Sequence, residues 1–186
     1  MIPFGKDFID KCKQGDQRAQ KQLFEKLYAQ MYRVCFRYIG KQADPEDCLM
    51  RAFMKAFQKL DTFQHDGDHS LFFWIRKIMV NESLMEIRKM NSSLMVVQQD
   101  EVPDAKIEEN VLDLLSAEEL YKLVTDLPVG YRTVFNLFVI EGYSHQEIAE
   151  TMGISENTSK TQLLKARQRL RSSIEKMNGN YESYAG

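Results

Sequence analysis

The chain has 186 residues, which is enough for one medium-sized domain or for two small ones. Hydrophobic residues make up 44% of it and aromatic residues 11%, values that are typical of a globular protein and too high for a mainly disordered one. No apolar run approaches the roughly 18 to 20 residues needed to cross a bilayer, and the first residues, MIPFGKDFID, lack the pattern of a signal peptide. We therefore expect a cytoplasmic protein with no membrane contact of its own.

The formal net charge of −2 hides a strong segregation of charge along the chain. Residues 1–90 carry 16 basic and 12 acidic side chains, residues 91–130 carry 2 and 9, and residues 131–186 carry 7 and 6. Most of the C-terminal basic residues fall between Lys160 and Lys176. Because attraction to phosphates is screened beyond about 10 Å at ordinary salt, a local cluster of this kind suits DNA binding. A solvated helix face would show the same cluster, so the surrounding motif must decide.

Apolar residues recur at intervals of three and four along the chain, as in helices, and we find no convincing strand. The first half predicts helices over residues 8–15, 17–39, 45–60 and 71–89. Gly40 ends the second of these, and Asp44 as N-cap with Pro45 at the first helical position begins the third. Ser70 can cap the fourth. These helices predict an N-terminal domain over residues 1–90.

Residues 91–110 are polar and acidic without a sustained period, which is typical of a flexible linker. A second helical domain is predicted over residues 111–178, followed by a frayed tail over 179–186. Within that domain, Asp126-Leu127-Pro128 separates one helix from another that begins near Val129. The predicted fold class is therefore all-α, with two small helical domains joined by an acidic linker.

The cysteines and histidines do not form a recognisable metal or catalytic motif. Cys12, Cys35 and Cys48 are odd in number and widely spaced, so we expect reduced residues within helices. His65 and His69 could share a metal ion with a neighbouring aspartate, but this alternative has no further support in the sequence. The sequence also lacks a Ser-His-Asp set, a zinc-deaminase motif and a Gly-rich phosphate loop. We expect no catalytic residue, no metal and no cofactor.

The segment YSHQEIAETMGISENTSKTQLLKARQRL has the pattern of a helix-turn-helix. Ser144 caps a short helix, Gly153 permits a left-handed turn, and Ser155 caps a second helix that runs to about Ile174. The outer face of this second helix would enter a major groove, with amides and hydroxyls at base edges and basic groups at phosphates. The candidate residues are Asn157, Thr158, Lys160, Thr161, Gln162, Lys165, Arg167 and Arg169. An ordinary helical hairpin with a charged face is the alternative.

Three segments together resemble the extracytoplasmic-function (ECF) branch of the bacterial sigma-70 family. LPVGYRTVFNLFVIEGYSHQEIAETMGISENTSKTQLLKARQRL resembles region 4, DPEDCLMRAFMKAF resembles region 2.2, and LFFWIRKIMVNESLMEIRK resembles regions 2.3 and 2.4. Two separated motifs in the right order are more specific than a helix-turn-helix alone. The resemblance implies an initiation factor that brings RNA polymerase to promoters, where region 4 binds the −35 element and region 2 opens the −10 element.

The resemblance implies core RNA polymerase as a partner, contacted at its β′ coiled coil and β flap, together with promoter DNA and a possible anti-sigma factor. We expect a monomer when the chain is free. The matching polymerase-binding residues are Asp44, Glu46, Asp47, Met50, Arg51, Phe53 and Met54. Met50 and Met54 lie off the apolar stripe of their helix, which suits a docking face. The alternative is that both are buried.

The resemblance also implies that a base unstacked from the −10 element is captured by the loop before region 2.3 and by the helix that follows. The matching residues are His65, Asp66, Ser70, Phe72, Trp74, Arg76, Lys77, Asn81 and Arg88. Stacking on an aromatic ring contributes about 1 to 3 kcal/mol per base, and an asparagine amide can recognise a flipped base edge. Alternatively, Trp74 and Phe73 belong to the core and Asn81 makes a structural hydrogen bond.

The recognition helix departs from the common family pattern at two places. Asn157-Thr158-Ser159 replaces a frequent Gly-Thr-Val, and Gln162 replaces a frequent arginine. Because glutamine prefers adenine where arginine prefers guanine, we expect a −35 sequence richer in A·T pairs. Two other classes of protein remain as rivals. One is an independent DNA-binding regulator whose N-terminal helices dimerise or sense a signal, and the other is a helical enzyme, for which no motif is present.

Overall fold

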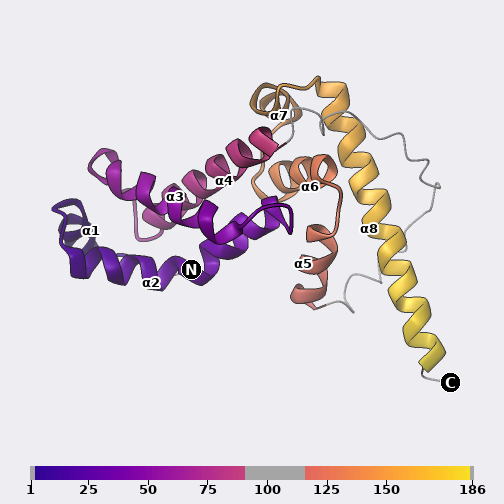
Figure 1. Ribbon diagram of the computed structural model, residues 1–186, viewed down its shortest axis with the longest axis horizontal. Helices are drawn as coiled ribbons and strands as arrows, with labels where there is room; N and C mark the ends of the chain where they lie inside the picture. The colour runs from indigo at the N-terminus through magenta and orange to yellow at the C-terminus, as the bar shows by residue number, and fades with distance from the viewer. Residues whose placement is uncertain (1–2, 91–115, 185–186) are drawn as a thin grey trace. The chain divides into compact units, whose positions relative to one another are not determined.

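All regular elements in the described part of the chain are helices. This computed structural model describes residues 3–90 and 116–184, with side chains up to residue 177, and no strand occurs among them (Figure 1). The chain divides into two compact units, Met1–Met90 and Asn91–Gly186. The predicted all-α fold class is confirmed. The proposed linker over residues 91–110, and the proposed start of the second domain at residue 111, lie outside the described residues.

The first unit is a set of helices packed around α2. It contains α1 (Lys6–Lys13), α2 (Gln17–Ile39), α3 (Pro45–Gln58), a 3₁₀ turn η1 (Leu60–Thr62) and α4 (Ser70–Met90). Helices α3 and α4 pack against α2 and against each other. One side of α2 is apolar and faces the core, since Leu23, Leu27, Met31, Val34 and Tyr38 are all buried. This core fixes the faces that α3 and α4 leave exposed.

Side-chain caps fix the starts of α2 and α3. The Asp16 carboxylate accepts hydrogen bonds from the backbone N–H groups of Arg18, at 2.8 Å, and Ala19, at 2.9 Å. The Asp44 carboxylate accepts one from the N–H of Glu46 at 2.9 Å, just before Pro45 enters the helix. Each cap satisfies donors that the first turn of a helix leaves without an intrahelical partner. The predicted start of α3 is therefore confirmed.

The second unit consists of three shorter helices packed along one long C-terminal helix. It contains α5 (Ala117–Thr125), α6 (Val129–Phe135), a π-helical turn η3 (Asn136–Ile140), α7 (His145–Met152) and α8 (Glu156–Tyr184). The buried Arg132 guanidinium donates to the carbonyl oxygens of Thr125, at 2.8 Å, and Leu127, at 3.1 Å. These bonds close the turn between α5 and α6. Leu127, Tyr131 and Ala166 then form a core between α6 and α8.

Helix α8 is longer than the sequence predicted. We expected its end at about Ile174 and a frayed tail over residues 179–186, whereas the helix continues to Tyr184. No proline follows Ile174, and a single glycine such as Gly179 costs about 1 kcal/mol in a helix without ending it. The expected end near Ile174 was therefore too early.

Candidate functional site

Helices α7 and α8 form a helix-turn-helix. Gly153 ends α7 with φ 66° and ψ 35°, the left-handed conformation that glycine adopts without steric cost. The Ser155 hydroxyl then accepts a hydrogen bond from the N–H of Thr158 at 3.0 Å and caps α8. Ile148 and Met152 of α7 and Leu163 of α8 are buried. The predicted turn, cap and apolar contacts of this motif are therefore present.

The face of α8 that points away from the core is polar and basic with one apolar exception. From the start of α8 to Arg167, its exposed residues are Glu156, Asn157, Lys160, Thr161, Leu164 and Arg167. Of the other predicted DNA-binding residues, Thr158, Lys165 and Arg169 are half-buried at the edges of this face. Lys160 pairs with Glu156 one turn earlier, at 3.3 Å. Most of the predicted set therefore shares one surface, which has the residue types that contact bases and phosphates in a major groove.

Gln162 was wrongly predicted to lie on this surface. Its side chain is only 2% exposed and packs against α6, where a Cβ added to Gly130 would lie 3.2 Å from Gln162 Oε1 and Nε2. Successive residues of a helix are rotated by about 100°, so the position just before the buried Leu163 remains close to the core. The inference of an adenine preference from Gln162 therefore loses its basis.

The sequence analysis missed a contact that joins the two helices of the motif. His145 of α7 places its Nδ1 2.9 Å from the hydroxyl of Ser159 on α8, and its ring stacks on Phe138 at a centroid distance of 4.5 Å. Burial, together with the nearby Lys160, lowers the pKa of His145 below 6.5, against an opposing effect of Glu156. The contact was not predictable because it joins residues 14 positions apart on two different helices, and no local pattern specifies it.

The exposed face of α3 carries methionines, as predicted for a docking helix. Met50 is 45% exposed and Met54 is 59% exposed, so the alternative that both are buried is wrong. Asp44, Glu46 and Asp47 are exposed at the start of the same helix. Phe53, by contrast, is buried and its ring lies 4.8 Å from that of Phe24 on α2, so its predicted place on the docking face was wrong. Its position on the core side of α3 accounts for the difference.

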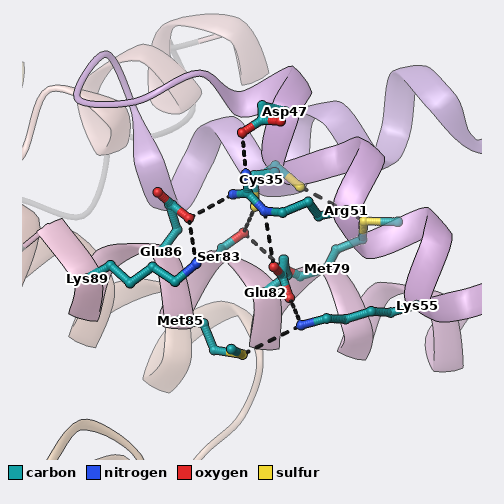
Figure 2. Close-up of polar contacts among 11 residues, drawn as sticks. Cys35, Asp47, Arg51, Lys55, Met79, Glu82, Ser83, Met85, Glu86 and Lys89 are labelled. Carbon is teal, nitrogen blue, oxygen red and sulfur yellow. Dashed lines mark hydrogen bonds and ion pairs between the residues drawn. The ribbon is translucent and has the colours of Figure 1, made fainter.

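Arg51 of α3, predicted to bind polymerase, is held by carboxylates of its own unit. It donates to Glu82 at 3.3 Å and to Glu86 at 2.7 Å, both on α4, and also pairs with Asp47 (Figure 2). Lys55 forms a second ion pair with Glu82. The carboxylate of Glu82 is almost wholly buried, and although burial opposes it, hydrogen bonds from Lys55 and Arg51 hold the pKa of Glu82 below 4.5. We call Arg51, Lys55, Glu82 and Glu86 the α3–α4 ion network.

Buried thiols lie beside this network. The Cys48 sulfur is 3.7 Å from the hydroxyl of Ser83, and the Cys35 sulfur is 3.9 Å from the sulfur of Met79 (Figure 2). Cys12, Cys35 and Cys48 are all free and buried within helices, which confirms the prediction made for them. Of the three, Cys35 of α2 and Cys48 of α3 lie against residues of α4, whereas Cys12 lies on α1.

Helix α4 exposes a row of residues that differs from the predicted set. Phe72 is buried, so its ring does not lie on the exposed face where it was predicted, and Trp74 is half-buried against Phe63 at 5.4 Å between ring centroids. The exposed aromatic residue is Phe73, at 48%, which the sequence analysis had considered only for the core. Lys77 and Asn81 follow at intervals of four and are exposed, as is Arg88 farther along, while Arg76 is half-buried. An aromatic ring, a cation and an amide therefore line one face of α4.

The loop before α4 is polar and closed by one hydroxyl. The Ser70 Oγ donates to the carbonyl oxygen of Gly67 at 2.7 Å and accepts a hydrogen bond from the N–H of Asp66 at 3.1 Å. His65, Asp66 and His69 are exposed around it.

Across residues 3–90 and 116–184, no group of three or more histidine, cysteine or acidic side chains is placed to hold a metal ion. Within the same residues, no helix is long and apolar enough to cross a membrane.

Comparison with known proteins matches both units. Residues 23–92 match the family model described as Sigma-70 region 2, and residues 117–170 match that described as Sigma-70, region 4. The chain is 27% identical over 178 residues to the ECF RNA polymerase sigma factor SigW of Bacillus subtilis, covering 89% of this chain and 94% of that protein. It is 24% identical over 179 residues to the ECF RNA polymerase sigma-E factor of Escherichia coli, covering 90% and 92%.

A solved structure was also found by similarity. The sigma factor RpoE of Bartonella quintana, crystallised in complex with the anti-sigma factor NepR, aligns with a TM-score of 0.48 at 21% identity, covering 83% of this chain and 96% of that one.

Proposed function

This chain belongs to the ECF branch of the bacterial sigma-70 family, and from that premise we propose that it directs core RNA polymerase to specific promoters and initiates transcription there. The observation that supports the proposal is that each of the two units exposes a face whose residue types suit contact with nucleic acid. One is the helix-turn-helix face of α8, and the other is the aromatic, cationic and amide row of α4. The proposed action is binding without catalysis by the chain itself, in the cytoplasm.

The α8 face supports recognition of a −35 element in duplex DNA. Asn157 and Thr161 provide an amide and a hydroxyl that can contact base edges. Lys160 and Arg167 provide charges for phosphates on one side of this face, and Lys165 provides one on the other side. The face is held rigidly, because Leu163 and Ala166 pack on the opposite side of the same helix. A rigid recognition helix loses little conformational entropy when it enters the groove.

The exposed row of α4 supports opening of the −10 element. Phe73 offers a ring on which an unstacked base can stack, Lys77 can hold the adjacent phosphate, and Asn81 can hydrogen-bond to a base edge. Trp74 then has a supporting role, because its indole lies against Phe63. The polar loop around Ser70 lies at the N-terminal end of this row, as expected for the site that captures the flipped base.

The exposed methionines of α3 support docking on polymerase. Met50 and Met54 lie four residues apart, on one face of the helix, and their flexible side chains pack well on another helix such as the β′ coiled coil. Arg51 contributes by fixing α3 to α4, which holds the docking face and the −10 face in a constant arrangement within the first unit.

The experiment that tests this function is run-off transcription from a promoter library with core polymerase, with and without the protein. Promoter-specific transcripts should appear only when the protein is added. The Lys160→Ala variant should reduce them severalfold, since a phosphate contact is lost, whereas Lys176→Ala, an exposed lysine of the same helix beyond the proposed contact face, should not. An unchanged transcript pattern, together with specific DNA binding by the protein alone, would instead support an independent regulator.

Strand opening is tested separately with Phe73→Ala. This variant should reduce transcription from duplex promoters by about 5- to 150-fold, corresponding to loss of about 1 to 3 kcal/mol of stacking, and a template already unpaired at the −10 element should restore it. Equal loss on duplex and unpaired templates would show that Phe73 acts elsewhere. Phe73 is exposed, so the substitution leaves the core of the unit intact.

A further inference from the structure

Leu164 is an apolar residue in the middle of the polar face of α8. Its side chain is 57% exposed, whereas the neighbouring apolar residues Leu163 and Ala166 are buried on the core side of the same helix. Isolated exposed leucines are common on protein surfaces and need no explanation by themselves. The position of this one, among the residues proposed to contact DNA, is what requires an account.

The surroundings of Leu164 define what it can meet. Asn157, Lys160 and Thr161 precede it on the exposed face, and Arg167 follows one turn later. With a rise of about 1.5 Å per residue, the face from Asn157 to Arg167 is about 15 Å long, close to the width of about 12 Å of a major groove. Leu164 lies within this length and not beyond it. Lys160 and Arg167 lie seven residues apart and therefore on one flank of this face, Lys165 lies on its other flank, and Leu164 lies between the two flanks. A helix that brings these flanking cations near phosphates therefore turns Leu164 toward the floor of the groove.

The floor of the major groove presents one apolar group, the C5 methyl of thymine; the other groups are hydrogen-bond donors and acceptors. A leucine cannot satisfy those donors and acceptors, so placing it against a G·C pair would cost hydration without return. We propose that Leu164 determines specificity by packing against the methyl group of a thymine in the −35 element. This inference rests on the proposed function, because it requires that α8 enters the major groove of a promoter.

The proposal gives a new physical basis for sequence preference in this helix. Gln162, which had been expected to favour adenine, is buried against α6 and cannot contact a base without leaving the core. Leu164 instead requires an A·T pair at one defined position and leaves the neighbouring positions to Asn157 and Thr161. The preference is therefore local, and it does not extend to the whole element.

The test uses the holoenzyme and promoter duplexes that it selects from a random library. Each thymine of the selected −35 element is replaced in turn by deoxyuridine, which removes only the methyl group and keeps every hydrogen bond of the base pair. At one position the wild-type holoenzyme should bind about fourfold more weakly, the loss expected for one buried methyl group. Leu164→Ala holoenzyme should bind thymine and uracil duplexes equally at that position. Leu164→Met, which keeps an apolar side chain, should retain part of the discrimination.

The possible outcomes separate this inference from the function on which it rests. A holoenzyme that selects no duplex sequence overturns both. Selection of a −35 element followed by no loss at any uracil position, or by the same loss in Leu164→Ala as in the wild type, overturns the inference alone. A selected element without an A·T pair also overturns it. Thr161→Ala is the matched control, since it alters the same face of α8 and should leave the uracil effect unchanged.

Discussion

At the scale of single residues, the buried Gln162 contributes to the stability of the second unit and does not lie on the face of α8 proposed to contact DNA. Its amide packs against Gly130 and is 2% exposed, whereas Asn157 lies on the outer face. We expect Gln162→Ala to lower the free energy of unfolding of the second unit by about 1 kcal/mol and to leave the selected −35 sequence unchanged. Asn157→Ala should leave the free energy of unfolding of the second unit nearly unchanged and should change the selected −35 sequence. Selection of duplexes by each variant holoenzyme measures the preferred bases, and thermal unfolding measures the stability. A change in the selected bases caused by Gln162→Ala would contradict this prediction.

His145 gives the helix-turn-helix a defined dependence on pH. Burial and Lys160 lower its pKa below 6.5, so folding favours the neutral imidazole that contacts Ser159. The stability due to this depressed pKa is therefore present above about pH 6.5 and is lost as the pH falls below it. NMR titration of the ring, assigned by comparison with His145→Gln, should give a midpoint below 6.5. A midpoint at or above this value would contradict the proposed burial of the ring against Phe138.

Which residues of α8 face the core and which face solvent could be predicted only as precisely as the position of each residue around the helix axis was known. The caps at Ser144 and Ser155 were identified correctly, because N-cap chemistry is a local signal. Gln162 was misplaced because polarity was taken as a guide to exposure. The adjacent core position, rather than the residue type, decides which way a helical side chain points.

At the scale of helices, the α3–α4 ion network joins two elements that the proposed function uses for different tasks. Glu82 is 3% exposed and accepts hydrogen bonds from both Arg51 and Lys55. Removing this carboxylate leaves two cations without their buried partner, so we expect Glu82→Ala to lower the free energy of unfolding of the first unit by about 3 kcal/mol. Trp74, the one tryptophan of the chain, lies in this unit and reports its unfolding in urea by fluorescence.

The control for this substitution is an exposed ion pair of the same unit. Glu25 pairs with Lys21 at 3.8 Å on the surface of α2, so Glu25→Ala should change the free energy of unfolding by less than about 0.5 kcal/mol. Because the pKa of Glu82 is lowered, its contribution is present above about pH 4.5 and is lost as the pH falls below that value. The difference between wild type and Glu82→Ala should shrink in acid. A difference below about 1 kcal/mol at neutral pH would show that the network contributes little.

The helices themselves were largely predictable, but the contacts between them were not. Caps and glycines gave the starts of α3, α7 and α8, because these signals act within a few residues of the helix end. The network between Arg51 and Glu82 joins residues 31 positions apart, and no local pattern in either helix specifies it. The same limitation explains Phe72 and Phe73, since an aromatic pair at a helix start does not indicate which ring faces the core.

At the scale of the whole molecule, the segregation of charge along the chain should affect the affinity of the free protein for DNA. The basic face of α8 belongs to a chain with a net charge of −2, in which residues 91–130 alone contribute −7. Replacing Glu101, Glu108 and Glu109 by glutamine changes the net charge from −2 to +1, since three negative charges are removed. We expect this variant, without polymerase, to bind random-sequence duplex DNA severalfold more tightly at low salt, with the difference vanishing at about 0.5 M salt. Fluorescence anisotropy of a labelled duplex measures both conditions.

A second variant distinguishes the acidic segment from total charge. Replacing Asp7, Glu25 and Asp61 by their amides produces the same net charge of +1 but alters only exposed residues of the first unit. If the acidic segment opposes DNA binding by the helix-turn-helix that follows it in the chain, the first variant should gain more affinity than the second. Equal gains would mean that net charge alone sets the affinity, and no gain in either would show that acidic side chains do not oppose DNA binding by the free protein. In the holoenzyme, where polymerase holds the factor on the promoter, we expect the two variants to initiate transcription at the same promoters as the wild type.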